Sequence, residues 1–412
     1  MPTFRNWART VESHPSAWVS PESEDELAEV IRRSRRVRVV GAGHSWSPIA
    51  APEDVGVRLD KLAGVPSITR ERVVVRAGTR LGELNAALAA HGLALPIVGS
   101  IDAQTVAGLV ATGTHGSSLA HGNLASFVRR MTVLDGRGER VEIDPGGYVH
   151  LGALGVVIDV ELIVVPAFRL AETVETIPVR DVYAQVETIA RSAEYVKVWW
   201  MPHARDAHVF RYERTTDPPS PAAQRTRWLD NRMHQYVFPS VLRLARFPRL
   251  VPHIGRAIAR TFAKPRRVGP STLMLSTPMP ARHRETEAAL PLARAGEALE
   301  RAVRIVGDMP VNFLTELRFV RGDQMWLSPA TGGDTAQLGA YCQGACTDAY
   351  FAAFWREMRA LGARPHWGKE LDHTADEIRA LWSEHPRFVN LRDKLDPERR
   401  YGSSFLSRVL GD

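Results

Sequence analysis

The sequence of 412 residues contains only two cysteines, Cys342 and Cys346. This scarcity excludes a disulfide framework and a four-cysteine zinc site. The two stand four positions apart, which is not the usual Cys-x-x-Cys redox spacing, so we expect two ordinary thiols. His115, His203 and His366 do not show metal-ligand spacing either, and we expect no metal.

Long apolar runs are also absent. No stretch reaches the roughly 18 uninterrupted apolar residues of a membrane-spanning helix, and the N-terminus shows no apolar leader segment. The expectation is therefore a cytoplasmic protein. With 44% hydrophobic and 24% charged residues, the composition is ordinary for a globular protein and excludes disorder or coiled coil as the main architecture.

Acidic residues are nearly missing from one segment, residues 221–270. It contains 11 Lys and Arg residues and one acid, Asp230, so it carries a net charge of +10, while the whole chain carries +7. Three interpretations remain open: a solvated insertion, a peripheral contact with an anionic membrane, and a lid or pocket wall for an anionic substrate. No nucleic-acid recognition motif accompanies the charge, so we expect no nucleic-acid partner.

Hydrophobic periodicity predicts the main elements. Helices are expected at 24–34, 81–91, 241–247, 254–260 and 348–362. Strands are expected at 37–40, 73–76, 155–165, 197–200, 208–212 and 313–319, with a hairpin over 129–143 that turns at Asp135-Gly136. The first 165 residues therefore read as dense α/β, and strands are expected to dominate from about 170 to 330.

Two glycine-rich stretches indicate a phosphate-bearing cofactor. Gly41-Ala42-Gly43-His44-Ser45 follows a predicted strand, and its backbone N–H groups could cradle a pyrophosphate, although a third glycine of the dinucleotide fingerprint is missing. The second stretch contains Gly99-Ser100, Gly108 and Ala111-Thr-Gly-Thr-His-Gly116. Small and hydroxyl side chains at this density would let a flat ligand lie against the backbone.

Glu316 and Arg318 alternate with apolar residues, so they should project from one face of a strand. On an exposed strand they would be a solvated ion pair worth about 0–1 kcal/mol. In a pocket they could orient a polyol. Lys369, in His366-Trp367-Gly-Lys, would ordinarily be a surface residue.

Taken together, these motifs resemble the vanillyl-alcohol-oxidase flavoprotein superfamily, and within it the branch of sugar-1,4-lactone oxidases and alditol oxidases. Further resemblance lies in the segments 151–157, 197–203 and 364–369, so that it covers nearly the whole chain. The resemblance implies an α+β fold: a two-subdomain PCMH-type FAD-binding domain and an antiparallel-sheet substrate domain flanked by helices. The implied boundaries are 1–168 for the FAD-binding domain, 169–363 for the substrate domain with its basic insertion, and 364–412 for a C-terminal segment that returns to the flavin.

The resemblance also implies FAD, attached covalently through its 8α-methyl carbon to His44. A glycine at the position of Gly99 tends to accompany oxidases in this superfamily, because it leaves a path for O2. The implied cofactor-binding residues are Gly41, Ala42, Gly43, His44, Ser45, Gly99, Ser100, Gly108, Thr112, Gly113, His115, Gly116, Val157 and His366.

By the same resemblance, Arg318 and Lys369 stabilise a developing alkoxide. Glu316 would hydrogen-bond the substrate, Ser100 would lie near the reacting carbon, and Tyr341 and Trp367 would contact the substrate. Two departures limit this inference. Gly339-Ala-Tyr341 stands where alditol oxidases carry His-x-Thr, which argues against a simple alditol. The segment 401–405 lacks the asparagine usual in relatives.

The expected function is an FAD-dependent oxidase of a hydroxyl on a sugar lactone, sugar or related polyol, with O2 reduced to H2O2. One alternative is a dehydrogenase that passes electrons to a quinone or cytochrome. Another is a flavin-free, membrane-associated binding protein on the same scaffold. The sequence does not indicate an oligomeric state.

Overall fold

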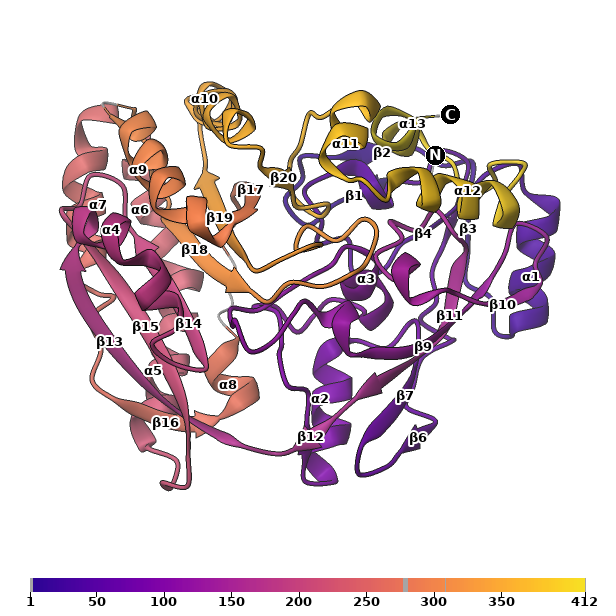
Figure 1. The fold of residues 1–412 in the computed structure, drawn as a ribbon, viewed down its shortest axis with the longest axis horizontal. Helices are drawn as coiled ribbons and strands as arrows, with labels where there is room; N and C mark the ends of the chain where they lie inside the picture. Colours follow the sequence, from indigo (N-terminus) through magenta and orange to yellow (C-terminus); the bar gives the residue numbers. More distant parts are fainter. Residues whose placement is uncertain (1–2, 277–280, 308, 412) are drawn as a thin grey trace.

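The computed structural model describes residues 3–276, 281–307 and 309–411. Figure 1 shows two lobes: a large sheet with its helices on one side, and several smaller sheets on the other. The N-terminal and C-terminal parts of the chain share the second lobe, with the yellow C-terminal helices lying over the indigo and violet N-terminal elements.

The N-terminal lobe contains two principal sheets. A parallel sheet has the order β3-β5-β4, from β3 (Ala17–Val19), β5 (Val55–Val57) and β4 (Val37–Val39). An antiparallel sheet has the order β10-β9-β11-β7-β6, from β6 (Ser67–Ile68), β7 (Arg72–Arg76), β9 (Val128–Leu134), β10 (Arg140–Glu142) and β11 (Val156–Ile163). Short strand pairs complete the lobe: β1 (Phe4–Arg5) with β2 (Glu12–Ser13), and β8 (Leu93–Ala94) with β12 (Val165–Pro166).

Local sequence accounts for the helices of this lobe. Helix α1 (Glu24–Arg33) begins after Ser23, whose side chain accepts a hydrogen bond from the backbone of Glu26, and it buries Leu27 and Ile31. Helix α2 is Leu81–Ala90 and helix α3 is Val106–Ala111. The predicted hairpin is confirmed, because Leu134 pairs with Arg140. The left-handed residue of its turn is Gly138, at φ +75°, rather than the expected Gly136.

The second lobe is built on one eight-stranded sheet, ordered β16-β13-β15-β14-β18-β19-β17-β20 and antiparallel throughout. Its strands are β13 (Arg169–Pro178), β14 (Tyr195–Trp200), β15 (Asp206–Thr215), β16 (Arg267–Pro270), β17 (Arg284–Pro291), β18 (Thr315–Val320), β19 (Thr335–Cys342) and β20 (Arg364–Pro365). Side chains alternate between its faces. Val196 and Val198 face a core shared with α4, α9 and α10, while Trp199 belongs to the core on the other face.

The expectation that strands dominate residues 170–330 needs correction. Helices α4 (Val179–Ala190) and α9 (Ala295–Val306) lie in this part of the chain, and α10 (Thr347–Ala360) packs beside α9. Amphipathic spacing explains them, because α9 turns Leu299, Ala302 and Val306 toward the sheet. The helices cover one face of the large sheet, which leaves the other face for the site.

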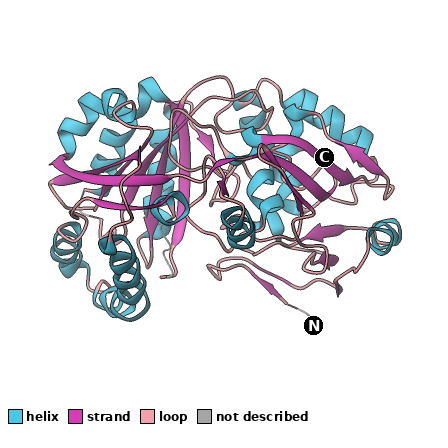
Figure 2. Cartoon of the chain, turned by 90° about the horizontal axis from the view of Figure 1, so that it is seen from below, coloured by secondary structure: helices cyan, strands magenta, loops and turns pink. Residues whose placement is uncertain are grey.

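The basic segment forms a chain of short helices at the edge of the second lobe (Figure 2). They are α5 (Pro221–Arg232), a π-helical turn (Met233–Val237), α6 (Phe238–Leu244) and α7 (Val251–Ala259), and α8 (Ser271–Leu275) follows just after the segment. Eight large apolar side chains of this segment are exposed: Trp228, Leu229, Met233, Tyr236, Val237, Leu244, Phe247 and Leu250. Within the described residues, no helix is both long enough and apolar enough to cross a membrane.

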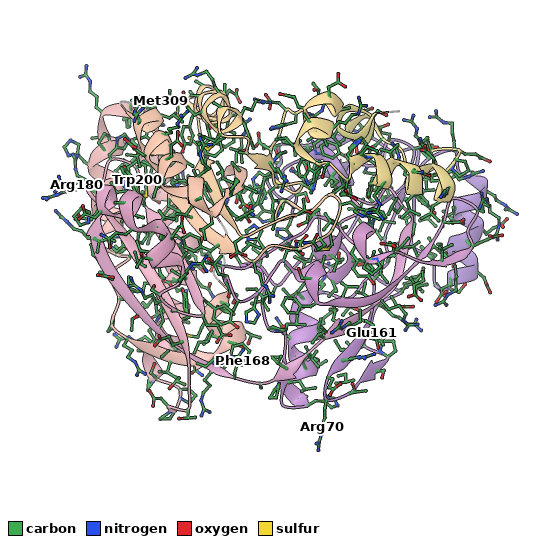
Figure 3. All side chains as sticks on the ribbon, in the orientation of Figure 1. Arg70, Glu161, Phe168, Arg180, Trp200 and Met309 are labelled. Carbon is green, nitrogen blue, oxygen red and sulfur yellow. The ribbon has the colours of Figure 1, made fainter. Side chains whose placement is uncertain are left out.

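The two lobes are joined by packing at Phe168 and by the returning C-terminal segment. Phe168 lies between the lobes in Figure 3 and stacks on Tyr195, whose hydroxyl donates to the carbonyl of Pro96 at 2.7 Å. After β20, helices α11 (Ala375–Leu381), α12 (His385–Leu395) and α13 (Ser404–Leu410) pack over the N-terminal lobe. There the buried guanidinium of Arg38 donates to the carbonyl of Tyr401.

Candidate active site

A glycine-lined channel runs into the N-terminal lobe. It encloses about 1050 Å³ of space, part of it open to solvent. Its walls come from the end of β4, from α3 and from the loop before β11, and they are formed by segments 37–45, 104–112 and 150–157 together with Tyr401. Much of the lining is glycine or alanine, including Gly41, Ala42, Gly43, Gly78, Gly108, Gly152 and Gly155, so a long ligand would lie largely against backbone.

Close backbone packing explains why glycine occupies this channel. A Cβ on Gly41 would stand 2.4 Å from Oγ1 of Thr105, and one on Gly108 would stand 3.0 Å from the same atom. Gly43 has φ +66°, a conformation that other residues rarely adopt. The loop that follows β4 therefore presents its backbone to the channel, as a pyrophosphate cradle requires.

His44 lies where this channel meets a second cavity, because its side chain lines both. The imidazole stacks on Trp7 with ring centroids 5.7 Å apart. Its buried Nδ1 has no hydrogen-bond partner in the part of the chain that the structure describes. Burial lowers the pKa of His44, and Arg80 and Lys369 lower it further, so the ring is neutral near pH 7. A neutral ring with an unpaired nitrogen at the channel's inner end fits a covalent cofactor link.

The second cavity is polar and encloses about 740 Å³. It lies on the sheet face that α4 and α9 leave uncovered, between β17, β18 and β19 and the loops of the N-terminal lobe. The lining residues are Trp7, His44, Ser45, Trp46, Ser100, Ile101, Gln104, Thr112, Thr114, His115, His283, Glu285, Glu287, Arg318, Tyr341, His366, Gly368 and Lys369.

Arg318 is held in this pocket from two sides. Its Nη2 donates to Oε2 of Glu316 at 2.6 Å and to Oγ of Ser100 at 2.7 Å. Glu316 also accepts hydrogen bonds from the indole of Trp199 at 2.7 Å and from the hydroxyl of Tyr341 at 3.0 Å. Burial alone would raise the pKa of Glu316, but Arg318 and Lys197 lower it to about 2. The carboxylate is therefore charged and fixes both Arg318 and Tyr341.

Lys369 brings a second cation to the opposite wall. Its ammonium pairs with Glu285 and lies 4.4 Å above the ring of Trp46. The ring of His283 packs against Trp46 at 5.3 Å and closes this side. Burial opposes ionisation of Glu285, yet Lys369 keeps its pKa below the ordinary value. The pocket thus holds two cations whose counter-ions are fixed behind or beside them.

His115, Glu287 and His366 form a third group, with ligand atoms within 4.8 Å of one another. Nε2 of His115 hydrogen-bonds to Glu287 at 2.8 Å, and Nδ1 of His366 accepts from the backbone of Gly368 at 3.1 Å. Burial lowers the pKa of His366 to about 4, so it is neutral. Spacing alone did not indicate this cluster. Each group already has a partner within the protein, so the cluster is satisfied without an ion.

Most residues expected from the sequence meet at these two cavities. Those that line the channel are Gly41, Ala42, Gly43, His44, Ser45, Gly108, Thr112 and Val157. Those that line the polar pocket include Ser100, His115, Arg318, Tyr341, His366 and Lys369. Gly99, Gly113 and Gly116 are not among the lining residues of either cavity, but their local geometry favours glycine. A Cβ on Gly99 would stand 3.1 Å from Thr114, Gly113 has φ +64°, and a Cβ on Gly116 would stand 2.6 Å from Ile97.

Two expected substrate contacts lie elsewhere. Glu316 is 2% exposed, hydrogen-bonds Arg318 and Tyr341, and is not among the described residues that line the pocket. Trp367 packs in the core, where its indole donates to the carbonyl of Leu327 at 2.7 Å and its ring stacks on Trp382. The causes differ: the loop turns Trp367 into the core, whereas Glu316 projects from the same face of β18 as Arg318 and is covered by Arg318 and Tyr341.

Several lining residues were missed from the sequence. Glu285 and Glu287 alternate on β17 and are both buried, and the pattern Glu-Thr-Glu followed by apolar residues was the available signal. Trp7, Trp46 and His283 carry no local motif, because they meet only through tertiary packing.

Comparison with known proteins identifies the fold of the chain. Residues 15–144 match the family model described as an FAD binding domain. The whole chain superimposes on cholesterol oxidase from B. sterolicum with a TM-score of 0.81 at 17% identity, covering 99% of this chain and 96% of that one. The fold and the glycine-lined channel therefore define an FAD-binding protein of the PCMH type.

The C-terminal part identifies the family. Residues 160–409 match the model described as D-arabinono-1,4-lactone oxidase. L-gulonolactone oxidase of Scyliorhinus torazame is 30% identical over 99% of this chain and 98% of its own length. L-gulono-1,4-lactone dehydrogenase of Mycobacterium tuberculosis is 30% identical over 100% of this chain and 99% of its own. The chain belongs to the D-arabinono-1,4-lactone oxidase family.

Proposed function

We propose that this protein is an FAD-dependent oxidase of sugar lactones, which oxidises a ring hydroxyl and reduces O2 to H2O2. The observation that carries this proposal is the meeting, at His44, of a glycine-lined cofactor channel and a polar pocket with two cations. A dehydrogenase of the same substrates remains the second candidate, because the mycobacterial relative bears that name at the same identity.

FAD fits the channel on two observations. Gly41 has no room for a Cβ beside Thr105, Gly43 has φ +66°, and the buried Nδ1 of His44 has no hydrogen-bond partner among the described residues. We propose that the imidazole ring of His44 carries the flavin covalently. When bound, the flavin supplies a hydride acceptor. Gly99 carries no side chain next to Thr114, where a Cβ would stand 3.1 Å from Cγ2, and we propose that this position leaves access for O2 to that acceptor.

The pocket residues would stabilise charge at the reacting hydroxyl. Arg318 and Lys369, which both line the pocket, would present cations to the oxygen as its proton leaves. Ser100 and Tyr341 offer hydroxyl groups, each fixed by a hydrogen bond to the Arg318–Glu316 pair. Glu285 and Glu287 line the wall as acceptors for the remaining hydroxyls of a polar ring. This lining favours a small polyhydroxy substrate over an apolar alcohol.

Substrate turnover tests the function. A panel of sugar lactones and alditols would be incubated with the purified yellow protein, with H2O2 release in air compared with dye reduction under argon. We expect turnover of lactones and equivalent peroxide in air. Dye reduction without peroxide would establish the dehydrogenase, and a colourless protein that turns over no lactone would contradict both. Acid precipitation of the same sample should bring the flavin down with the polypeptide.

We also propose that the basic segment contacts an anionic membrane surface. Exposed aromatic side chains alternate there with arginines: Arg232 lies 5.1 Å from the ring of Trp228, and Arg246 lies 4.9 Å from that of Phe247. Apolar burial and attraction to anionic headgroups would act together on such a surface. The described residues that line the polar pocket include none from 221–270, so a lid for an anionic substrate is less well supported.

The positions of the large sheet and of the channel lining support a division of the chain after residues 168 and 363. We propose 1–168 as the FAD-binding domain, 169–363 as the substrate domain and 364–412 as the segment that returns to the cofactor. The large sheet begins with β13 at Arg169, and Tyr401 lines the channel.

A further inference from the structure

The two cysteines of this chain lie in contact. Cys342 ends β19, Cys346 immediately precedes α10, and the three-residue turn between them contains Gly344 at φ +114°. Their Sγ atoms are 3.4 Å apart. A disulfide has a length of about 2.05 Å, so the two sulfur atoms need to approach by only about 1.4 Å.

The surroundings favour a charged sulfur in this pair. The hydrogen bond between the two sulfur atoms, together with hydrogen bonds from the turn, lowers the pKa of Cys342 to about 7. The pKa of Cys346 is raised by the same contact. The contact between the sulfur atoms thus favours one thiolate beside one thiol, which is the arrangement of a reactive thiolate beside a resolving thiol.

The pair is also reachable. Cys342 is fully buried, but Cys346 is half-buried and lines an open depression of about 1110 Å³. Arg243, Arg246 and Arg282 line the same depression, so its positive potential favours the thiolate form. A small neutral oxidant can enter from solvent and meet the sulfur atom of Cys346.

We propose that Cys342 and Cys346 form a dithiol–disulfide site that responds to hydrogen peroxide. A thiolate sulfur attacks one peroxide oxygen, the O–O bond breaks, and the sulfur becomes a sulfenic acid while hydroxide leaves and takes up a proton as water. The second thiol then attacks that sulfur, the S–O bond breaks, and a second water leaves. The two cysteines lose two electrons and two protons in total, and the peroxide gains them.

This inference rests on the proposed oxidase function only in one respect: turnover would supply the H2O2. The reaction of the two cysteines with H2O2 does not depend on that function. The holoenzyme would be reduced with dithiothreitol, desalted and treated with a graded series of H2O2. We expect peptide 322–356, the tryptic fragment that contains both cysteines, to lose two hydrogen atoms in mass and to regain them with dithiothreitol. In the Cys342→Ser variant, oxidation should stop at a sulfenic acid on the accessible Cys346, which dimedone traps.

A second arm separates the two proposals. The enzyme would turn over a lactone in air, with and without catalase, before the same mass measurement. Disulfide formation with added peroxide but not during turnover would contradict the oxidase function and leave the site intact. If added peroxide leaves both thiols free, or carries Cys346 alone to a sulfinic acid, the dithiol site is wrong.

Discussion

At the scale of single residues, the pocket depends on charges that are buried and held by specific partners. Arg318 is 13% exposed in its side chain, and its counter-ion Glu316 is 2% exposed. Removing one member of such a pair leaves the other uncompensated, which is costly in a low dielectric. The two N–H groups of Nη2 serve Glu316 and Ser100 respectively, so one nitrogen of the planar guanidinium is fixed from two directions.

Arg318→Lys tests this geometry, because lysine keeps the charge but cannot reach both partners in the same way. We expect kcat/KM for the lactone to fall about 10- to 100-fold, the loss that follows from a charged hydrogen bond of about 1.5–3 kcal/mol. Arg304→Lys, on the exposed face of α9, is the matched control and should change kcat/KM less than about twofold. An Arg318→Lys enzyme with full activity would show that this cation takes no part in the reaction.

His44→Ala tests the proposed tether. We expect the variant to lose its yellow colour from the acid-precipitated pellet, because the flavin can then be held only by the channel. The control is His91→Ala, a surface histidine at the end of α2, which should retain the flavin. Flavin that still precipitates with the His44→Ala polypeptide would place the link elsewhere.

At the scale of elements, local patterns predicted most helices and strands of the N-terminal lobe. Apolar spacing over 24–34 and 81–91 and the Asp-Gly turn of the hairpin are short-range signals, and α1, α2 and β9–β10 confirm them. The site was harder to predict from the sequence than the elements were. The burial of Glu316 and the contribution of Glu285 to the pocket both depend on pairing between β17, β18 and β19. No property of the single strand distinguishes a solvated ion pair from a buried one.

The basic segment carries a prediction of its own. The double variant Trp228→Ser/Phe247→Ser should bind anionic vesicles at least about tenfold more weakly than the unaltered protein, since each ring would lose about 1.5–3 kcal/mol of apolar burial. Arg246→Glu should weaken binding in a salt-dependent way. Lactone turnover should not change in either variant.

Co-sedimentation with vesicles of phosphatidylserine and phosphatidylcholine provides the measurement, and pure phosphatidylcholine vesicles provide the neutral control. Arg304→Glu reverses an exposed charge outside the segment and should leave binding unaffected. Equal binding of all these variants, or no binding by the unaltered protein, would favour a solvated insertion.

At the scale of the whole molecule, the free energy of unfolding should depend on pH through one buried lysine whose pKa is lowered by burial. Lys197, on β14, lies over the ring of Trp199 at 4.3 Å and opposite Arg318 in the strand register. Burial lowers its pKa to about 8, although Glu316 opposes the shift. Between pH 8 and the ordinary value of 10.5, the unfolded chain therefore holds a proton that the folded chain has lost. Because the unfolded chain binds more protons than the folded chain in this window, the free energy of unfolding rises with pH between about 8 and 10.5.

Lys197→Met removes this dependence. We expect the variant to exceed the unaltered protein in free energy of unfolding by about 3 kcal/mol below pH 8, and the difference to shrink as pH rises toward 10.5. Chemical denaturation at several pH values between 7 and 10 measures it. A difference that does not vary with pH would show that the lysine is not discharged by folding.

The contact between Arg38 and the carbonyl of Tyr401 has a consequence in time. The Gly41–Gly43 loop is synthesised early, whereas Tyr401, which completes the channel wall, is synthesised 357 positions after His44. At synthesis rates of about 5–20 residues per second, the early lobe waits roughly 20 to 70 seconds for that wall. Flavin that enters earlier meets an open trough rather than a channel. Maturation of the enzyme is therefore expected to follow translation of residue 401 and to be sensitive to the flavin supply at that moment.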